Sequence, residues 1–262
     1  MPRTSEPGRT VSSRLLEVLF AFTTDHPRLS VADLTRMTAM PRATVRRLVL
    51  ELVSVGALQH DDTGHYTVGL RLWQLGTLAP LTEPLRTLAQ PFIEDLYTAL
   101  QQHVQLAVLE GQEAVIIERL SAPDALPLAS QVGGHMPLHC TGVGKVLLSH
   151  ADQELIDKVL GGPLRRYTAR TVVDPAELRS QIAACRRTGT AVVRGEFTDD
   201  AESIATRIMD GEGRVVAALS VVVRAGSAKH HAILPSVVTS GLAMSRTLGW
   251  RPAHRPAASQ RA

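Results

Sequence analysis

The most constraining feature of the sequence is the segment PRATVRRLVLELVS at residues 41–54, which combines an arginine cluster with an amphipathic helical pattern. Its aliphatic residues recur at helical spacing and therefore share one side of a helix: Val45, Leu48 and Leu52. Its first turns carry three basic residues: Arg42, Arg46 and Arg47. Most charged runs only solvate the surface of a helix, so the role of these arginines depends on the neighbouring segments.

The segments before this helix predict two further helices. Apolar residues at helical spacing predict the first helix over residues 11–23. Ser30 and Asp33 form a variant of the capping box, which predicts a short helix over residues 31–37. Only the tripeptide TAM separates that helix from Pro41, a residue suited to the first turn of the next helix.

A hairpin is predicted directly after the third helix. Gly56 ends the helix, and two short strand-like runs then surround an Asp-Asp-Thr-Gly turn in which Gly64 takes the position that tolerates positive φ. Three helices followed by a hairpin is the order of a winged helix-turn-helix domain. We therefore expect this domain over residues 11–69, after a flexible N-terminus of residues 1–10.

This context turns the arginine cluster into a candidate DNA-binding surface. In a helix-turn-helix motif the second helix enters the major groove, and its N-terminal residues meet the base edges. The guanidinium group of arginine can read guanine or grip phosphate. The candidates are Arg42, Ala43, Thr44, Arg46 and Arg47, with Ser30 and His65 as further contacts. At the hairpin, Asp61 and Asp62 form an acidic tip that is expected to repel phosphate.

Charge counts predict that one copy of this domain binds DNA weakly. Residues 1–60 contain eight basic and five acidic side chains, and the net charge of the whole chain is only +3. Two copies on a palindromic site are therefore expected, as is common for such modules. Aromatic residues make up only 3% of the chain, which argues against a stacking platform for single-stranded nucleic acid.

The rest of the 262-residue chain predicts a second domain of mixed helices and strands. A linker helix is expected over residues 70–82, and the second domain over residues 83–250, of α/β or, taking the whole chain, α+β class. Within the second domain we expect helices at residues 84–102, 141–150, 153–160, 174–187 and 233–248, and strands at VQLAVLEG, EAVIIERL, GTAVVRGEF and RVVAALSVVV. The tail, residues 251–262, is expected to be disordered.

No enzymatic, metal-binding or membrane class fits the sequence. Gly144 and Lys145 resemble part of a phosphate-binding loop, but the required Ser or Thr after the lysine is absent. Cys140 beside His139 is better explained as a small buried residue than as a nucleophile. No ligand spacing for a metal, no signal peptide and no membrane-spanning run is found, so we expect a cytoplasmic protein without a cofactor. A helix beginning near Thr141 after a glycine-rich loop instead offers free backbone amides to a small anion.

These motifs together resemble the IclR family of bacterial transcription regulators. The resemblance is carried, in order, by LSVADLTRMTAMPRATVRRLVLELVSVGAL, HYTVGLRLWQLG, LHCTGVGKVLLS and GPLRRYTARTVVDPAELRSQIAACRRTG. It implies a winged helix domain followed by a GAF-like effector domain, and dimers or dimers of dimers on palindromic operators. It also implies control by a small molecule, often a carboxylate or an aromatic acid.

The resemblance also implies which residues line the effector pocket. The matching positions are Gly142, Val143, Val193, Ser203, Ser220 and Val222. Several depart from the family pattern, because Val193 replaces an Asp, Ser203 replaces a Cys and Val222 replaces a small polar residue. One wall is therefore expected to be less polar, unless Arg194 or Arg207 supplies a cation. Two readings remain open: a regulator that responds to an effector, and a constitutive repressor with a degenerate pocket.

Overall fold

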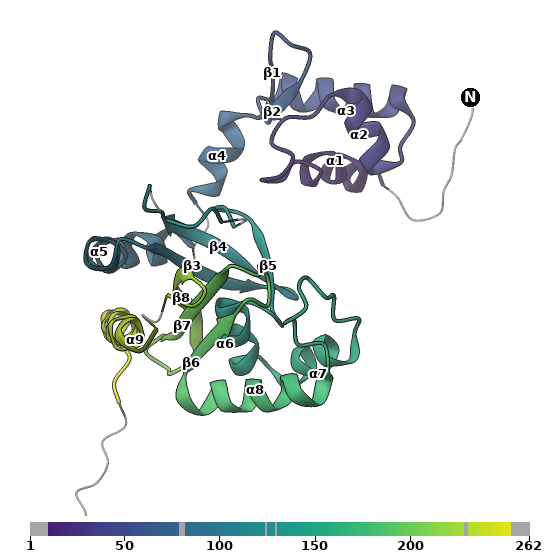
Figure 1. Ribbon diagram of the computed structural model, residues 1–262. Helices are drawn as coiled ribbons and strands as arrows, with labels where there is room; N and C mark the ends of the chain where they lie inside the picture. Colours follow the sequence, from purple (N-terminus) through teal and green to yellow (C-terminus); the bar gives the residue numbers. More distant parts are fainter. Residues whose placement is uncertain (1–9, 79–81, 124, 129, 228–229, 253–262) are drawn as a thin grey trace, which may run out of the picture. The chain divides into compact units, whose positions relative to one another are not determined.

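The computed structural model describes residues 10–78, 82–123, 125–128, 130–227 and 230–252. The chain separates into two compact units, Met1–Glu83 and Pro84–Ala262 (Figure 1). The predicted N-terminus of residues 1–10 and tail of residues 251–262 lie largely outside the described residues. Within the described part of the chain, no helix is both long and apolar enough to cross a membrane.

The N-terminal unit contains the predicted three helices and hairpin. Its elements are α1 (Val11–Phe20), α2 (Val31–Thr38), α3 (Arg42–Ser54), β1 (Leu58–His60), β2 (Tyr66–Val68) and α4 (Leu70–Gly76). The helix predicted over residues 11–23 ends earlier, at Phe20. Val45, Leu48 and Leu52 are buried in the core of this unit, as their spacing predicts.

Local features define both ends of α2. At the start of α2, the Ser30 side chain accepts from the Asp33 backbone N–H at 3.2 Å, and the Asp33 carboxylate accepts from the Ser30 N–H at 3.1 Å. This reciprocal cap is the predicted capping box. Ala39 ends α2 in the left-handed region, with φ of 52°, which turns the chain sharply toward Pro41. The turn leaves the first residues of α3 on the surface.

The C-terminal unit is a six-stranded antiparallel sheet in the order β5-β4-β3-β8-β7-β6. Its strands are β3 (His103–Glu110), β4 (Glu113–Leu120), β5 (His135–Pro137), β6 (Thr190–Arg194), β7 (Ala201–Met209) and β8 (Val215–Arg224). Its helices are α5 (Thr82–Leu100), α6 (Gly142–His150), α7 (Gln153–Gly161), α8 (Pro175–Thr188) and α9 (His230–Thr247). The last helix was predicted to begin at residue 233. In the structure it begins at His230, so Pro235 lies inside it.

Strand β7 is the one described long strand that the sequence pattern did not predict. It carries Glu202 and Arg207, and charged residues are rare in buried strands. The structure accommodates Glu202, whose side chain is 1% exposed, by pairing it with Arg194 on β6 at 3.0 Å. A cross-strand ion pair of this kind cannot be predicted from the sequence before the register of the sheet is known.

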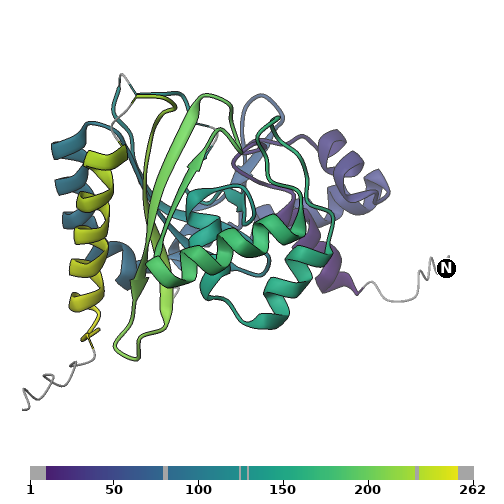
Figure 2. The same ribbon diagram turned by 60° about the horizontal axis from the view of Figure 1, so that its bottom comes forward.

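The two faces of the sheet carry different residues. Helices α5 and α9 cover one face, and α6, α7 and α8 cover the other (Figure 2). Along β8, Leu219, Val221 and Val223 pack toward α5 and α9. The intervening residues Ala218, Ser220 and Val222 face α6. The small Ala218 and Ser220 side chains let α6 approach the sheet closely, beside the pocket described below.

Candidate DNA-binding surface and effector pocket

The start of α3 presents a basic surface. Arg42, Ala43, Arg46 and Arg47 are exposed, and Thr44 is half-buried. Among the described residues, none forms an ion pair or a side-chain hydrogen bond with these arginines. The three guanidinium groups therefore extend from the motif without an internal structural role. That is the arrangement that a groove-binding helix requires.

Ser30 and His65, the two further contacts predicted from the sequence, are engaged within the domain. The Ser30 hydroxyl bonds to the Asp33 carboxylate at 2.7 Å, in addition to its role in the cap. The ring of His65 bonds to Thr63 at 3.0 Å, and its backbone N–H donates to Asp61. Both residues therefore organise the domain. A contact with DNA would have to use the polar atoms of Ser30 and His65 that these hydrogen bonds leave free.

The acidic hairpin tip differs from the expectation. Asp61 accepts hydrogen bonds from Thr63 and His65 and forms an ion pair with Arg28. The hydrogen bonds from Thr63 and His65 are the main causes of the lowered pKa of Asp61. Its charge is balanced by Arg28, so only Asp62 remains as an exposed acid at the tip.

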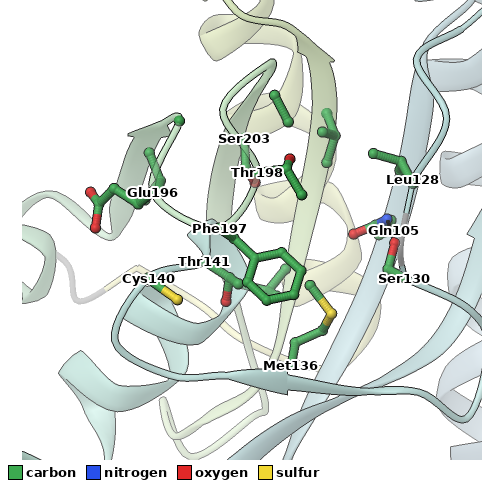
Figure 3. A pocket seen from close by; sticks show the side chains of 15 residues that line it. Gln105, Leu128, Ser130, Met136, Cys140, Thr141, Glu196, Phe197, Thr198 and Ser203 are labelled. Atoms are coloured by element: carbon green, nitrogen blue, oxygen red, sulfur yellow. Dashed lines mark hydrogen bonds between the residues drawn. The ribbon is translucent and has the colours of Figure 1, made fainter. Parts of the chain in front are cut away.

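A pocket lies between the start of α6, the sheet and two loops in the C-terminal unit (Figure 3). Its volume of about 50 Å³ exceeds what one water molecule needs. It is lined by Gln105, Leu128, Ser130, Met136, Cys140, Thr141, Val143, Val193, Gly195, Glu196, Phe197, Thr198, Ala201, Ser203 and Val222. Most of this lining is apolar, and no arginine or lysine belongs to it.

Four of the six residues singled out from the sequence line this pocket. Val193, Ser203 and Val222 are paired in one row across β6, β7 and β8, and Val143 faces them from α6. Gly142 is not itself a lining residue, but it packs directly against β7, where a Cβ would lie 2.4 Å from the Ser203 hydroxyl oxygen. Ser220 is 0% exposed and does not line the cavity, and its hydroxyl has no described hydrogen-bond partner.

The start of α6 offers polar groups to the pocket. Thr141 caps the helix by accepting from the Gly144 N–H at 3.1 Å, and its carbonyl accepts from the Lys145 N–H. Among the described residues, none accepts from the backbone N–H of Gly142 or Val143. These two amides form the positive end of the helix dipole. They can bind an anionic oxygen without a cationic side chain.

Lys145 has a structural role in this region. Its ammonium group is 2.6 Å from the Glu196 carboxylate and 2.7 Å from the Gln181 carboxamide oxygen, and both charged residues are buried. The pair joins α6 to the loop that carries Phe197. Cys140 lies nearby, and its burial raises the pKa of its thiol to about 12, so it stays protonated at neutral pH. No reactive thiolate is present at the pocket.

Neither Arg194 nor Arg207 supplies a cation to the less polar wall of the pocket. Arg194 is paired with Glu202, and the Arg207 guanidinium group donates to the His150 ring at 3.0 Å. Neither arginine lines the pocket. Of the two alternatives left open by the sequence, a cation from one of these arginines is therefore not the one found in the structure. The register of β6 and β7 carries both side chains to other partners.

The opposite wall of the pocket was not anticipated from the sequence. It consists of Gln105, Leu128, Ser130 and Met136, and Phe197 and Thr198 cover the cavity from another loop. Gln105 alternates with apolar residues along β3, and a buried polar residue on a strand is a weak signal of a site. Ser130 and Phe197 lie in irregular segments, whose position no periodic pattern reveals.

Comparison with known proteins places both units in one family. Residues 12–62 match the IclR helix-turn-helix domain, and residues 81–246 match the bacterial transcriptional regulator IclR C-terminal domain. Together these matches cover most of the chain.

Similar proteins include both curated regulators and solved structures. The chain is 32% identical to the Pca regulon regulatory protein of Pseudomonas putida over 94% of this chain and 85% of that protein. It is 30% identical to the transcriptional repressor AllR of Escherichia coli over 73% of this chain and 72% of that protein. An IclR homolog from Microbacterium hydrocarbonoxydans, solved with 4-hydroxybenzoate, superimposes with a TM-score of 0.86 at 33% identity, covering 91% of this chain and 99% of that one.

These relatives are transcription regulators and not enzymes. The helix-turn-helix match includes α2 and α3, and the C-terminal match spans most of the unit that holds the pocket. The chain therefore belongs to the IclR family of bacterial transcription regulators.

Proposed function

We propose that this regulator binds an aromatic carboxylic acid in the pocket between α6 and the sheet, and that this binding controls its attachment to an operator. The observation that carries the proposal is the combination of two unpartnered helix amides with an apolar cavity closed by Phe197 and Met136. The 4-hydroxybenzoate complex of the 33% identical homolog supports the same class of ligand.

The carboxylate of such an acid would lie at the start of α6. The amides of Gly142 and Val143 would donate to it, with the Ser203 hydroxyl on β7 as a third donor. Hydrogen bonds to a charged oxygen are stronger than those between neutral groups, so few donors suffice. The ring would lie against Phe197 and Met136, since aromatic and thioether groups both pack favourably against an aromatic face.

A thermal shift measurement tests this class of effector. Ligand that binds only the folded protein stabilises it by RT ln(1 + [L]/Kd), which is about 2.7 kcal/mol at a ligand concentration of 100 Kd. We expect 4-hydroxybenzoate to raise the melting temperature, and an uncharged analogue, 4-hydroxybenzamide, to raise it less. No rise with any aromatic acid would contradict the proposal.

A constitutive repressor is the second candidate function. Val193 and Val222 are apolar where the family pattern has polar residues, and this observation favours a pocket that has lost its ligand. A broad metabolite panel that leaves the melting temperature unchanged, combined with operator binding that no metabolite alters, would favour this candidate.

For the DNA contact, we propose that α3 lies in the major groove with Arg42, Ala43, Thr44, Arg46 and Arg47 toward the DNA. His65 would contact the backbone from the hairpin, while Ser30 serves mainly as the cap of α2. The Arg46→Ala variant is expected to weaken operator binding by about 1–3 kcal/mol if Arg46 reads a base.

The binding test uses fluorescence anisotropy with an operator selected from random DNA. Arg187→Ala is a matched control, because it removes one exposed positive charge from α8 in the other unit. If both variants lose the same affinity, only the net charge matters and the assignment of α3 fails.

A homodimer on a palindromic operator would give the affinity that one basic helix lacks. Helix α4 contains no buried residue and leaves Leu70, Trp73 and Leu75 at least 59% exposed. An apolar helix of this kind is typical of a surface that packs against another chain. Light scattering is expected to give a multiple of the 28.3 kDa chain mass. Such a regulator acts where the chromosome is, so a cytoplasmic location remains our prediction.

A further inference from the structure

Gln105 and Ser130 form a polar pair at the end of the pocket opposite to α6. Gln105 lies on β3 and is 3% exposed, and Ser130, in the segment that follows β4, is 4% exposed. The Gln105 side-chain amide donates to the Ser130 hydroxyl oxygen at 2.5 Å. Both side chains line the pocket, and Figure 3 shows the Gln105 carboxamide oxygen directed toward the side of Phe197.

The hydrogen bonds of this pair leave one acceptor and one donor free. Among the described residues, none donates to the Gln105 carboxamide oxygen, and none accepts the proton of the Ser130 hydroxyl. An acceptor beside a donor complements a hydroxyl group, which both donates and accepts. It does not complement a carboxylate. An ionised carboxylate only accepts hydrogen bonds, so it has no proton to donate to the Gln105 oxygen.

The pair is held in place by the residues behind it. The Arg119 guanidinium group, on β4, donates to the Ser130 carbonyl oxygen. Arg119 is paired with Gln105 in the register of β3 and β4, so strand pairing and this hydrogen bond position the two partners together. The His103 ring bonds to the Leu126 carbonyl oxygen, which fastens the same segment to β3. A site supported in this way is preorganised for its ligand.

The spacing between the two ends of the pocket matches a ring substituted at opposite positions. Gly142 packs on Ser203 and Ala205 of β7, whereas Gln105 lies on β3, with β8 between them. Two strand spacings separate the ends by about 10 Å. A benzene ring with a carboxylate at one end and a hydroxyl at the other spans the gap once hydrogen bonds are added at both ends.

We infer that Gln105 and Ser130 are specificity-determining residues that bind the ring hydroxyl of a para-hydroxylated aromatic acid. The phenol proton is donated to the Gln105 oxygen, and the phenol oxygen accepts from Ser130. The inference rests on the proposed function, since it assumes that the carboxylate lies at the start of α6. It extends that function by stating which aromatic acid the pocket selects.

Isothermal titration of the full chain with three acids tests the assignment. The probes are 4-hydroxybenzoate, benzoate and 2-hydroxybenzoate. A site built to bind a hydroxyl group discriminates strongly against a ligand that lacks one. We expect 4-hydroxybenzoate to bind at least about tenfold more tightly than either other acid. The 2-hydroxy isomer shows the effect of position, because its hydroxyl lies beside the carboxylate.

Variants then connect this preference to the pair. Gln105→Met keeps the size of the side chain but removes the acceptor, so the ratio of the affinities for 4-hydroxybenzoate and benzoate is expected to fall to near one. Retained benzoate binding shows that this variant folds. Ser130→Ala is expected to reduce the ratio in part. Ser203→Ala is the control, because it weakens both acids similarly and leaves the ratio unchanged.

The outcomes separate this inference from the proposed function. Equal binding of 4-hydroxybenzoate and benzoate by the unaltered protein overturns the assignment of the pair and leaves the aromatic acid as effector. A preference that survives in Gln105→Met and in Ser130→Ala also overturns it. Binding of neither acid overturns the proposed effector class and the inference together.

Discussion

Lys145 is a buried cation whose charge is balanced within the C-terminal unit. Its ammonium group contacts the Glu196 carboxylate and the Gln181 carboxamide, and its side chain is 5% exposed. In the sequence, Gly144 and Lys145 resemble a fragment of a phosphate-binding loop. In the structure the ammonium group of the lysine instead donates to Glu196 and Gln181 of its own domain. At the scale of single residues, burial therefore decides what a charged side chain does.

Removing this cation is expected to destabilise the protein. Lys145→Met leaves the Glu196 carboxylate buried without its partner, and breaking a buried ion pair in this way costs about 3–5 kcal/mol. The double variant Lys145→Met with Glu196→Gln removes both charges and should recover much of the loss. Urea denaturation measures both effects. Equal free energies of unfolding for the single variant and the unaltered protein would show that the pair contributes nothing.

At the scale of elements, α6 depends on two glycines that bring its start close to the sheet and to the preceding strand. A Cβ on Gly144 would lie 2.6 Å from the Pro137 carbonyl oxygen and 2.7 Å from the Leu138 Cα atom. Both obstacles are backbone atoms, which cannot move aside as a side chain can. The glycine therefore places the helix amides, and with them the proposed carboxylate site.

The Gly144→Ala variant is expected to lose stability, by about 1–3 kcal/mol as for other overpacked sites. It should also weaken binding of an aromatic acid, because α6 must shift away from β5. Gly161→Ala is the matched control. Gly161 is the last residue of α7, where a Cβ meets nothing within 4 Å, so alanine should stabilise the protein by up to about 1 kcal/mol. Thermal unfolding of both variants checks the contrast, and similar losses for the two would refute it.

At the scale of the whole molecule, three histidines of the C-terminal unit link stability to pH. Burial lowers the pKa of His103, His139 and His150, and Arg119, Lys145 and Arg207 lower them further as neighbouring cations. The folded state therefore favours the neutral imidazole more than the unfolded chain does. This contribution to stability is complete above the unfolded-state pKa of about 6.5 and is lost as the pH falls toward the folded-state values.

Acidification from about pH 7.5 to about pH 5.5 is accordingly expected to lower the free energy of unfolding. This window lies above the lowered pKa values of Asp33, Asp61, Asp157 and Asp210, so these carboxylates do not mask the effect. Replacing His150 by Gln removes one of the titrating groups and should make the dependence shallower. Denaturation curves recorded at both pH values measure the slope, and a flat profile would contradict the explanation.

Much of the fold follows from local patterns. Val45, Leu48 and Leu52 predict α3 because helical periodicity is a property of the nearest residues. The cap of α2 by Ser30 and Asp33 is equally local, and so is the hairpin turn at Gly64. Strand β7 was missed because it carries Glu202, a buried charge that pairs with Arg194 on another strand.

By itself, the sequence determined the helix-turn-helix motif with its exposed arginines, the glycine-rich start of α6 and the family to which these motifs point. The periodicities and the caps that specify them extend over a few residues. Only the tertiary structure decided which side chains share the pocket, because Gln105, Ser130 and Phe197 come from distant segments brought together by sheet register. It also decided that Lys145, Arg194 and Arg207 serve internal partners, since the burial and pairing of a charge depend on neighbours remote in the chain.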